Sequence, residues 1–532
     1  MYPYPDNPFP MPRRPVYGGR GMVATTQPLA AQAGLDMLKQ GGNAVDAAVA
    51  AAACLTVTEP VSNGIGGDAF ALVWQEGRLY GLNASGPAPQ AASIDRLLAL
   101  GYTGMPRRGL HAITVPGVPA AWAMLNSRFG SLSLESALAP AVNYAAQGFP
   151  LSPAIGRYWQ FFLDHDAPGL IGPEFQGWFD TFAQGGQLYP GKVITLPDHA
   201  ATLAEIGASQ GRAFYEGDLA DHIDAFMRAH GGLLRKSDLA QYQAEWVEPI
   251  SWRYHGYDVW EIPPNGQGLV ALMALNILDN FSLEERNAQA MHLQMEATKL
   301  AFSDGLAYIT DPRYLRQPLA DFLGKDYGQK RAALIGPAAA PCQARPMGGG
   351  TVYLCTADAE GNMVSYIQSN FDDFGSGVVV PGTGINLQNR GSSFQLDPAH
   401  NNALLPGKRT YHTIIPGFLT KDGQAQGPFG VMGAYMQPQG HLQTVCNLVD
   451  FGLDPQAALD APRWQWLREK KFKAETRLPL EIREQLLAKG HDLAADANSY
   501  GFGRGQIILR DPDSGVLAGG TDSRSDGVVA AW

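Results

Sequence analysis

Hydrophobic positions recur at helical spacing along much of the chain. Leu29, Leu35 and Leu38 fall on one face of residues 28–40, and the Gly41–Gly42 pair that follows is a common helix stop. Residues 44–55 are rich in alanine and predict a second helix packed closely in a core. Further helices are predicted at residues 120–129, 134–146, 217–230, 268–280 and 288–304.

Alternation with a period of two marks the predicted strands. Residues 70–74 and 79–82 alternate on either side of Glu76–Gly77 and predict a hairpin. Other strand-like runs cover residues 257–262, 351–357, 363–369, 412–419 and 505–509. Because groups of strands stand between groups of helices, we expect sheets whose outer faces are covered by helices.

Charge and composition narrow the class of protein. The 532 residues carry a net charge of −11, which disfavours binding to a phosphate backbone. Four cysteines without a CxxC pair indicate scattered reduced thiols. The most apolar segment, residues 44–58, is too short to cross a bilayer, and the first twenty residues lack an apolar run of signal-peptide length. We therefore expect a soluble, cytoplasmic protein that binds neither nucleic acid nor membrane.

A change of composition precedes one of the predicted strands. Residues 335–350, IGPAAAPCQARPMGGG, have no periodicity and are rich in alanine, proline and glycine, as in an exposed linker. Three glycines end this stretch, and a strand begins at Thr351. The next predicted strand follows after the turn 358–362, and pairing across this turn places Ser369 opposite Thr351. Facing side chains have Cβ atoms about 4.5–5.5 Å apart, so the two hydroxyls are within hydrogen-bonding reach.

A hydroxyl at the start of a strand, after flexible glycines, is suited to self-cleavage. The Thr351 oxygen can attack the carbonyl of Gly350, because glycine tolerates the strained backbone that the attack needs. Cleavage frees an α-amine with a reference pKa of about 7.7–8.0, which can act as general base for the hydroxyl of the same residue. The alternative is that Thr351 is an ordinary strand residue after a loop.

Several motifs in order resemble the γ-glutamyltranspeptidase family. They are Gly-Asn-Ala-Val-Asp-Ala-Ala-Val at 42–49, Glu-Pro-Val-Ser-Asn-Gly-Ile-Gly-Gly at 59–67, Val-Pro-Gly at 115–117, Phe-Tyr-Glu-Gly at 214–217, and Asp358, Gly361 and Asn362 after the nucleophile. The resemblance implies an α+β fold, a four-layer αββα sandwich. It also implies a precursor cut into fragments 1–350 and 351–532, which stay together as a heterodimer and form one catalytic unit. A dimer of such heterodimers is left open. By resemblance, Thr351 is the nucleophile and Ser369 the hydroxyl that supports it.

The substrate-binding motifs depart from the family pattern. The arginine that precedes an Ala-Pro pair in transpeptidases is missing from residues 83–89. Ser393 stands where the family has the aspartate that binds the substrate ammonium, and Arg390 replaces a glutamine. His412 and Thr413 replace a pair of serines. Met436 and Gln437 replace the two oxyanion glycines, where backbone N–H groups would still serve as donors.

Each of these departures has a functional interpretation and a structural alternative. Arg390 is suited to bind a substrate carboxylate, or it forms a surface ion pair. His412 donates to the same carboxylate, or it is an internal structural histidine. Asp372 and Asp373 replace the ammonium contact, or they are exposed loop acids; we favour the latter.

Together these features predict hydrolysis of a small amide that carries a carboxylate. Two of these altered motifs are Asn-Arg-Gly at 389–391 and Met-Gln-Pro-Gln-Gly-His at 436–441. They resemble the corresponding motifs of amidohydrolases of small amides, including oxamate amidohydrolase of purine breakdown, so oxamate is the favoured substrate. The alternatives are a γ-glutamyl hydrolase or transpeptidase, a cephalosporin-type acylase, an inactive homologue, and a serine hydrolase using Ser209 of Gly207-Ala-Ser-Gln-Gly211. The sequence contains no HExxH, EF-hand, P-loop or Rossmann pattern, so we expect no metal and no nucleotide cofactor.

Overall fold

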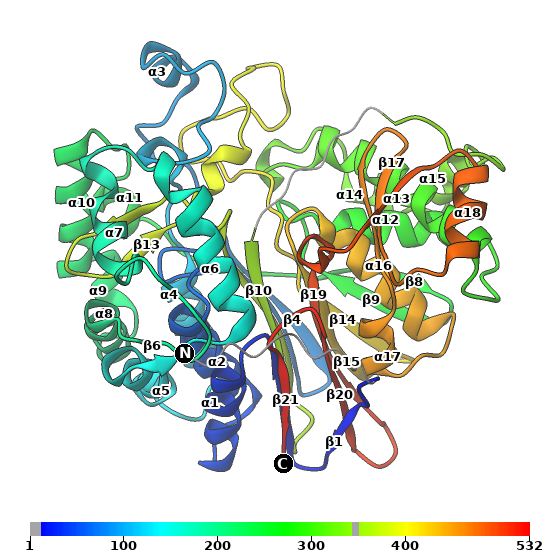
Figure 1. The fold of residues 1–532 in the computed structure, drawn as a ribbon, viewed down its shortest axis with the longest axis horizontal. Helices are drawn as coiled ribbons and strands as arrows, with labels where there is room; N and C mark the ends of the chain where they lie inside the picture. The colour runs from blue at the N-terminus through cyan, green and yellow to red at the C-terminus, as the bar shows by residue number, and fades with distance from the viewer. Residues whose placement is uncertain (1–11, 343–349) are drawn as a thin grey trace.

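Two seven-stranded antiparallel sheets form the centre of the computed structural model, which describes residues 12–342 and 350–532 (Figure 1). The first sheet has the order β1 (Val16–Gly18), β20 (Leu517–Thr521), β19 (Arg504–Arg510), β15 (Gln424–Met432), β14 (Gly417–Lys421), β9 (Tyr257–Glu261) and β8 (Ile250–Tyr254). The second has the order β21 (Val528–Ala531), β2 (Gly21–Thr25), β10 (Gly350–Asp358), β11 (Met363–Phe371), β3 (Asp68–Gln75), β4 (Arg78–Ala84) and β7 (Glu245–Val247).

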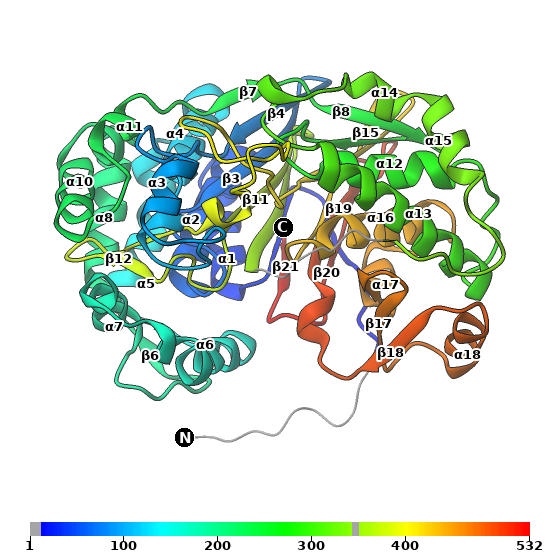
Figure 2. The same ribbon diagram turned by 90° about the horizontal axis from the view of Figure 1, so that it is seen from above.

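Three apolar cores separate four layers. Tyr353, Ile367 and Phe418 belong to the core between the two sheets. A second core joins the outer face of the β10 sheet to α1 (Pro28–Lys39), α2 (Ala44–Thr58), α4 (Val118–Phe129), α5 (Leu134–Gln147) and α8 (Pro197–Ala208). A third joins the other sheet to α12 (Gly268–Leu278), α13 (Ala288–Tyr308) and α16 (Met436–Val449). Figure 2 shows these two groups of helices on opposite sides of the sheets. The predicted αββα sandwich is confirmed.

The remaining elements lie around these layers. The other helices are α3 (Ile94–Ala99), α6 (Pro153–His165), α7 (Gln176–Phe182), α9 (Arg212–Tyr215), α10 (Asp218–His230), α11 (Lys236–Ala240), α14 (Leu319–Leu323), α15 (Lys325–Ala332), α17 (Pro455–Asp460) and α18 (Leu480–Ala488). Two small sheets have two strands each: β5 (Phe149–Pro150) pairs with β6 (Val193–Ile194), and β12 (Val378–Val380) pairs with β13 (Ile385–Leu387). A third small sheet has the order β16 (Trp464–Arg468), β17 (Lys471–Glu475) and β18 (Asp492–Asp496). Within the described part of the chain, none of the helices has the length and apolarity needed to cross a bilayer.

The Gly42–Val49 motif proves to be a helix start that is tied to β10. The side chain of Asn43 accepts from the backbone N–H groups of Val45 and Asp46, which completes a capping box at the start of α2. The Ala44 N–H donates to Asp358 Oδ2 at 2.9 Å, and Thr356 Oγ1 donates to the Ala44 carbonyl at 2.6 Å. These contacts hold α2 and the end of β10 together.

Only one of the predicted strands differs clearly from the structure. Residues 412–416 do not belong to β14, which begins at Gly417. Instead His412 forms an isolated bridge with Gly266, since its N–H donates to the Asn265 carbonyl and its carbonyl accepts from the Gln267 N–H, both at 2.9 Å. Pro416 has no N–H to donate to a strand ladder, so the regular pairing starts after it.

Each sheet combines strands from both sides of the Gly350–Thr351 bond. In the β10 sheet, β2 lies between β21 and β10, and β3 pairs with β11. In the other sheet, β1 pairs with β20, and β9 pairs with β14. Of the predicted linker, residues 335–342 are mostly exposed, Gly350 is buried as the first residue of β10, and residues 343–349 lie outside the described residues.

Candidate active site

Thr351 lies at an irregularity at the start of a central strand. From Val352 to Ala357, each residue of β10 faces the β11 residue that the predicted register assigns to it. The register shifts between Gly350 and Val352, so that Gly350 faces Phe371. The predicted contact between the two hydroxyls is nevertheless present, because Thr351 Oγ1 lies 3.1 Å from Ser369 Oγ. Both residues are fully buried.

The carbonyl of Gly350 lies between these two hydroxyls. Its oxygen accepts from Thr351 Oγ1 at 2.6 Å and from Ser369 Oγ at 2.8 Å. Ser369 Oγ in turn accepts from the Phe371 N–H at 2.8 Å, which orients the serine. Phe371 has a φ of 77°, a conformation that is strained for a bulky residue. The strained backbone thus lies directly beside the bond that is predicted to be cut.

The start of α16 supplies a side chain to Thr351 instead of the expected main-chain donors. The N–H groups of Met436 and Gln437 donate to the carbonyls of Gly433 and Ala434, because they close the turn that begins the helix. Gln437 Nε2, however, lies 3.5 Å from Thr351 Oγ1, and its Oε1 accepts from the Ile415 N–H at 2.9 Å. The side-chain amide of Gln437 is therefore the donor that faces the hydroxyl.

Arg390 is fully buried, so its interpretation as a surface ion pair is wrong. Its Nη1 donates to Thr413 Oγ1 at 2.7 Å, and its guanidinium lies over the ring of Phe371 at 4.2 Å. Burial lowers the pKa of Arg390 to about 10, against an opposing effect of Asp68. Its Nε and Nη2 have no hydrogen-bond partner among the described residues. The side chain thus offers two free donors in a buried position.

The imidazole of His412 binds a carboxylate of the protein itself. Its Nε2 lies 2.9 Å from Asp68 Oδ2, and both side chains are fully buried. Burial raises the pKa of Asp68 to about 7 and lowers that of His412 well below its usual value. The internal structural interpretation of His412 is therefore the one that the geometry supports. Asp68 was missed from the sequence, although it directly follows the Gly66–Gly67 end of a family motif.

Ser393 also lies in this buried region. It belongs to the short 3₁₀ helix Arg390–Ser393, and its carbonyl accepts from Asn402 Nδ2 at 2.8 Å. Its hydroxyl has no partner within the described ranges. The position therefore offers a neutral hydroxyl and not a carboxylate.

Asp372 and Asp373 are not exposed loop acids, and that expectation is wrong. Asp372 is buried, with Oδ2 2.7 Å from Arg107 Nε. Asp373 is partly buried and accepts from the hydroxyl of Tyr500, with Oδ1 at 3.1 Å and Oδ2 at 3.3 Å. Both partners come from distant parts of the chain, so local sequence gave no sign of them.

The serine hydrolase alternative fails on its structural context. Ser209 follows α8 directly and lies in the turn that leads to α9, whereas a nucleophile elbow joins a strand to a helix. Its hydroxyl accepts from the Ala213 N–H at 3.1 Å and lies 3.4 Å from the Ile206 carbonyl. We interpret Ser209 as a residue that stabilises this turn.

One further group of ligand-type side chains lies away from Thr351. In the part of the chain that the structure describes, His292, Glu296 and His491 bring such atoms within 4.8 Å of one another. Lys299 Nζ lies 2.6 Å from Glu296 Oε1, so an internal cation already neutralises the carboxylate. His292 Nε2 lies 2.9 Å from the Gly336 carbonyl. We interpret the group as an internal network that holds the described part of the linker.

Two sheets between two layers of helices are the arrangement of the N-terminal nucleophile hydrolases. A family model described as gamma-glutamyltranspeptidase matches residues 30–532. The chain belongs to this family and is thereby an amide-bond hydrolase made as a proenzyme.

Individual relatives cover nearly the whole chain. The crystal structure of a cephalosporin acylase from Bacillus halodurans is 54% identical, with a TM-score of 0.97, over 100% of this chain and 99% of that one. The glutathione hydrolase-like YwrD proenzyme of Bacillus subtilis is 36% identical over 97% of this chain and 99% of its own length. The oxamate amidohydrolase proenzyme of Klebsiella pneumoniae is 34% identical over 96% and 98%.

Proposed function

We propose that the chain cuts itself between Gly350 and Thr351 and then hydrolyses amides with Thr351 as nucleophile. The observation that carries this proposal is the position of Thr351 Oγ1, 2.6 Å from the Gly350 carbonyl oxygen and 3.1 Å from Ser369 Oγ. Fragments 1–350 and 351–532 remain together as one catalytic unit.

After cleavage, the new α-amine of Thr351 is the base in the reaction. It takes the proton of Oγ1 while this oxygen adds to the substrate carbonyl, and it returns the proton to the leaving nitrogen. Ser369 Oγ and Gln437 Nε2 stabilise the negative charge that develops on the carbonyl oxygen. Water then hydrolyses the ester on Thr351 and releases the acid.

We propose that the substrate is an amide of a small acyl group that carries a carboxylate. Arg390 supports this proposal, because a buried guanidinium with two unpartnered donors suits a planar carboxylate. Ser393 supplies no charge to pair with a substrate ammonium. Oxamate is the favoured substrate, and it would be converted with water into oxalate and ammonia, a reaction of purine catabolism in the cytoplasm.

A second candidate is a cephalosporin-type acylase. It is favoured by the similarity to the cephalosporin acylase of Bacillus halodurans, which is 54% identical over the whole chain. The two candidates differ in the distance between the cleaved amide and the carboxylate, and in the size of the leaving amine. A γ-glutamyl hydrolase or transpeptidase ranks third among the candidate functions. Its substrate carries an ammonium group, and Ser393 has no charge to pair with it.

A panel of substrates tests this proposal. Ammonia release is measured with oxamate and longer ω-amides of dicarboxylic acids, and aniline release with the matching monoanilides. γ-Glutamyl-anilide and an acetanilide without a carboxylate serve as controls. We expect turnover only with a carboxylate, and the best chain length selects between oxamate and a longer acyl group. Faster cleavage of γ-glutamyl-anilide, which also carries an ammonium group, or of acetanilide than of every amide in the dicarboxylic series would contradict the substrate assignment.

A further inference from the structure

The carboxylate of Asp373 lies against the residue whose peptide bond is predicted to break. A Cβ atom built on Gly350 would lie 2.5 Å from Asp373 Oδ1, which is closer than real Cβ contacts allow. The carboxylate therefore occupies the space beside the Gly350 Cα, next to the carbonyl that Thr351 faces. This close approach is a second reason, besides flexibility, for glycine at position 350.

Two distant segments hold Asp373 in this place. Arg108 Nη1 donates to its main-chain carbonyl at 2.8 Å and to that of Gly375 at 3.0 Å. The Tyr500 hydroxyl lies 3.1 and 3.3 Å from the two carboxylate oxygens, and its ring packs on Tyr158 with centroids 4.2 Å apart. Arg504 lies over both rings, 5.3 Å from each centroid.

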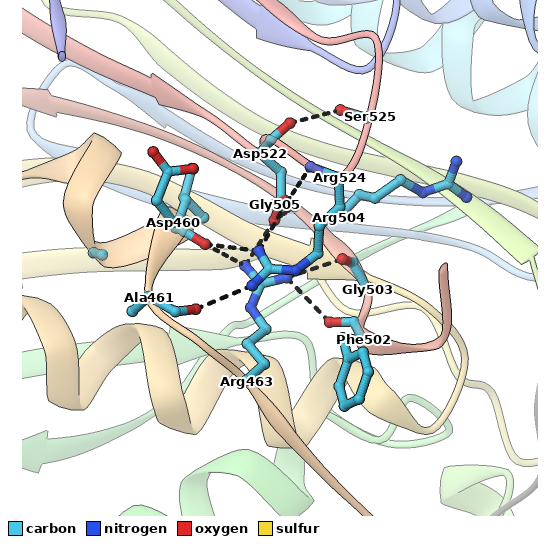
Figure 3. Close-up of polar contacts among 12 residues, drawn as sticks. Asp460, Ala461, Arg463, Phe502, Gly503, Arg504, Gly505, Asp522, Arg524 and Ser525 are labelled. Atoms are coloured by element: carbon cyan, nitrogen blue, oxygen red, sulfur yellow. Dashed lines mark hydrogen bonds and ion pairs between the residues drawn. The ribbon is translucent and has the colours of Figure 1, made fainter. Parts of the chain in front are cut away.

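The segment that carries Tyr500 is itself fixed by buried ions (Figure 3). Arg463 Nη1 donates to the carbonyls of Phe502 at 3.1 Å and Gly503 at 2.9 Å, as the close-up shows. The same guanidinium pairs with Asp522 at 2.8 Å, and Asp522 also accepts from the Gly505 N–H at 2.9 Å. The end of this segment, and with it Tyr500, is therefore attached to a buried part of the fold.

We propose that Asp373 is the general base and acid for the second half of self-cleavage, and that Tyr500 is its positioning residue. The assignment rests on the proposed self-cleavage at Gly350–Thr351. In the first half, Thr351 Oγ1 adds to the Gly350 carbonyl carbon, the C–N bond breaks, and the hydroxyl proton passes to the nitrogen. The product is an ester between Gly350 and Thr351 with a free α-amine.

Water then cleaves this ester with the help of the carboxylate. Asp373 takes a proton from water while the oxygen of that water adds to the Gly350 carbonyl carbon. The ester C–O bond breaks, and Asp373 returns the proton to Thr351 Oγ1. One water is consumed, Gly350 becomes a terminal acid, and the carboxylate of Asp373 is restored. Burial raises the pKa of Asp373 to about 6, with a contribution from Asp372, against the opposing effects of Tyr500, Arg108 and Arg504. A base with a pKa near the working pH is effective in such a transfer.

The first test uses Asp373→Asn in the full chain, with cutting followed on gels after pulse-labelled cell-free synthesis. We expect the rate to fall about 10²–10⁴-fold, the range for loss of a general acid–base group. Neutral hydroxylamine should then release a large fragment that carries a hydroxamate at Gly350, detected by intact mass, because the ester accumulates. Thr351→Ala should give no such fragment, and Asp422→Asn, at an exposed aspartate paired with Arg253, is the control that should cut at the wild-type rate.

The results separate this inference from the proposed function. If the wild type stays uncut, or Thr351→Ala is cut, the proposed function fails. If those two behave as expected but Asp373→Asn cuts at the wild-type rate, or stalls without a hydroxylamine-sensitive bond, only the role of Asp373 is overturned.

Tyr500→Phe provides a second test that does not require the asparagine variant to fold. The tyrosine hydroxyl lowers the pKa of Asp373, so its removal should raise that pKa. Because the carboxylate form is the base, the rise of the cutting rate with pH should move to higher pH, while the rate at high pH changes less. An unchanged pH profile of cutting in this variant would overturn the positioning role.

Discussion

The hydroxyl oxygen of Ser369 lies 3.1 Å from that of Thr351. Ser369 also donates to the Gly350 carbonyl oxygen at 2.8 Å, so one side chain contacts both the attacking oxygen and the oxygen that becomes negative during the attack. The two residues come from neighbouring strands of one hairpin, next to the regular pair Val352 and Gln368, although the register shifts at Thr351 itself.

Thr351→Ala should abolish both self-cleavage and amide hydrolysis, because it removes the single oxygen that performs both. Thr351→Ser keeps this oxygen and should retain part of each activity. Intact mass of the purified variants, together with the substrate panel, measures both effects. An alanine variant that is still cut between residues 350 and 351 would falsify the assignment of the nucleophile.

Ser369→Ala should slow both reactions while the fold is retained. Removing one donor to a developing oxyanion costs about 10²–10³-fold in rate. Ser369→Thr keeps a hydroxyl and should recover part of the lost rate. If Ser369 only filled space, the alanine variant should be faster than the variant with the larger threonine. The rate of cutting and kcat are the quantities to compare, and wild-type rates in the alanine variant would show that the contact has no part in catalysis.

Arg390→Lys should raise KM for the carboxylate-bearing amide and leave kcat less affected. An ammonium cannot reproduce two parallel hydrogen bonds to a carboxylate, and loss of a charged hydrogen bond costs about 1.5–3 kcal/mol, or roughly 10–100-fold. Arg313→Lys, at an exposed arginine paired with Asp311, is the matched control. Steady-state kinetics with the preferred substrate measures the change. Equal KM values in the two variants would remove Arg390 from substrate binding.

Asp522→Asn should destabilise the protein far more than a similar change at the surface. Asp522 is fully buried between Arg463 and Arg524, at 2.8 and 3.0 Å, and removing one partner of a buried ion pair costs about 3–5 kcal/mol. Asp422→Asn, whose exposed pair with Arg253 spans 3.3 Å, should cost less than about 1 kcal/mol. Urea unfolding at neutral pH compares the free energies, and similar losses in both variants would contradict the prediction.

The same aspartate predicts a pH dependence of stability. Desolvation opposes ionisation of Asp522, but Arg463 and Arg524 outweigh it and lower its pKa in the folded protein to about 2. A lowered pKa gives stability that is present above the unfolded value of about 3.9 and is lost as the pH falls towards 2. The free energy of unfolding should therefore fall by about 2 kcal/mol more in the wild type than in Asp522→Asn over this interval.

Local pattern was sufficient to predict the hairpin that carries the two hydroxyls. Its two strands stand on either side of a short turn, and the register predicted from this spacing holds from Val352 to Ala357, which brings Thr351 close to Ser369. The shift at Gly350, which faces the strained backbone of Phe371, was not predicted.

Contacts between distant segments escaped prediction. Asp68 meets His412 across 344 positions, and Asp373 meets Tyr500 across 127. In both cases the sequence around the aspartate resembles an ordinary loop or strand end. The residue that it contacts is far away in the chain and comes near only in the folded protein. The main-chain N–H groups of Met436 and Gln437 escaped prediction for a local reason: both are used by the turn before α16.

The combination of strands from both sides of the Gly350–Thr351 bond in each sheet has a consequence for the mature protein. β2 and β3, which precede the cut, form ladders with β21, β10 and β11, which follow it. The two pieces can separate only if these ladders break, so the cut chain should neither dissociate on dilution nor exchange pieces with another molecule. Once unfolded, however, the two pieces must find each other by diffusion, and refolding changes from a first-order to a second-order process. The proposed cut would thereby make recovery after unfolding depend on the concentration of the pieces.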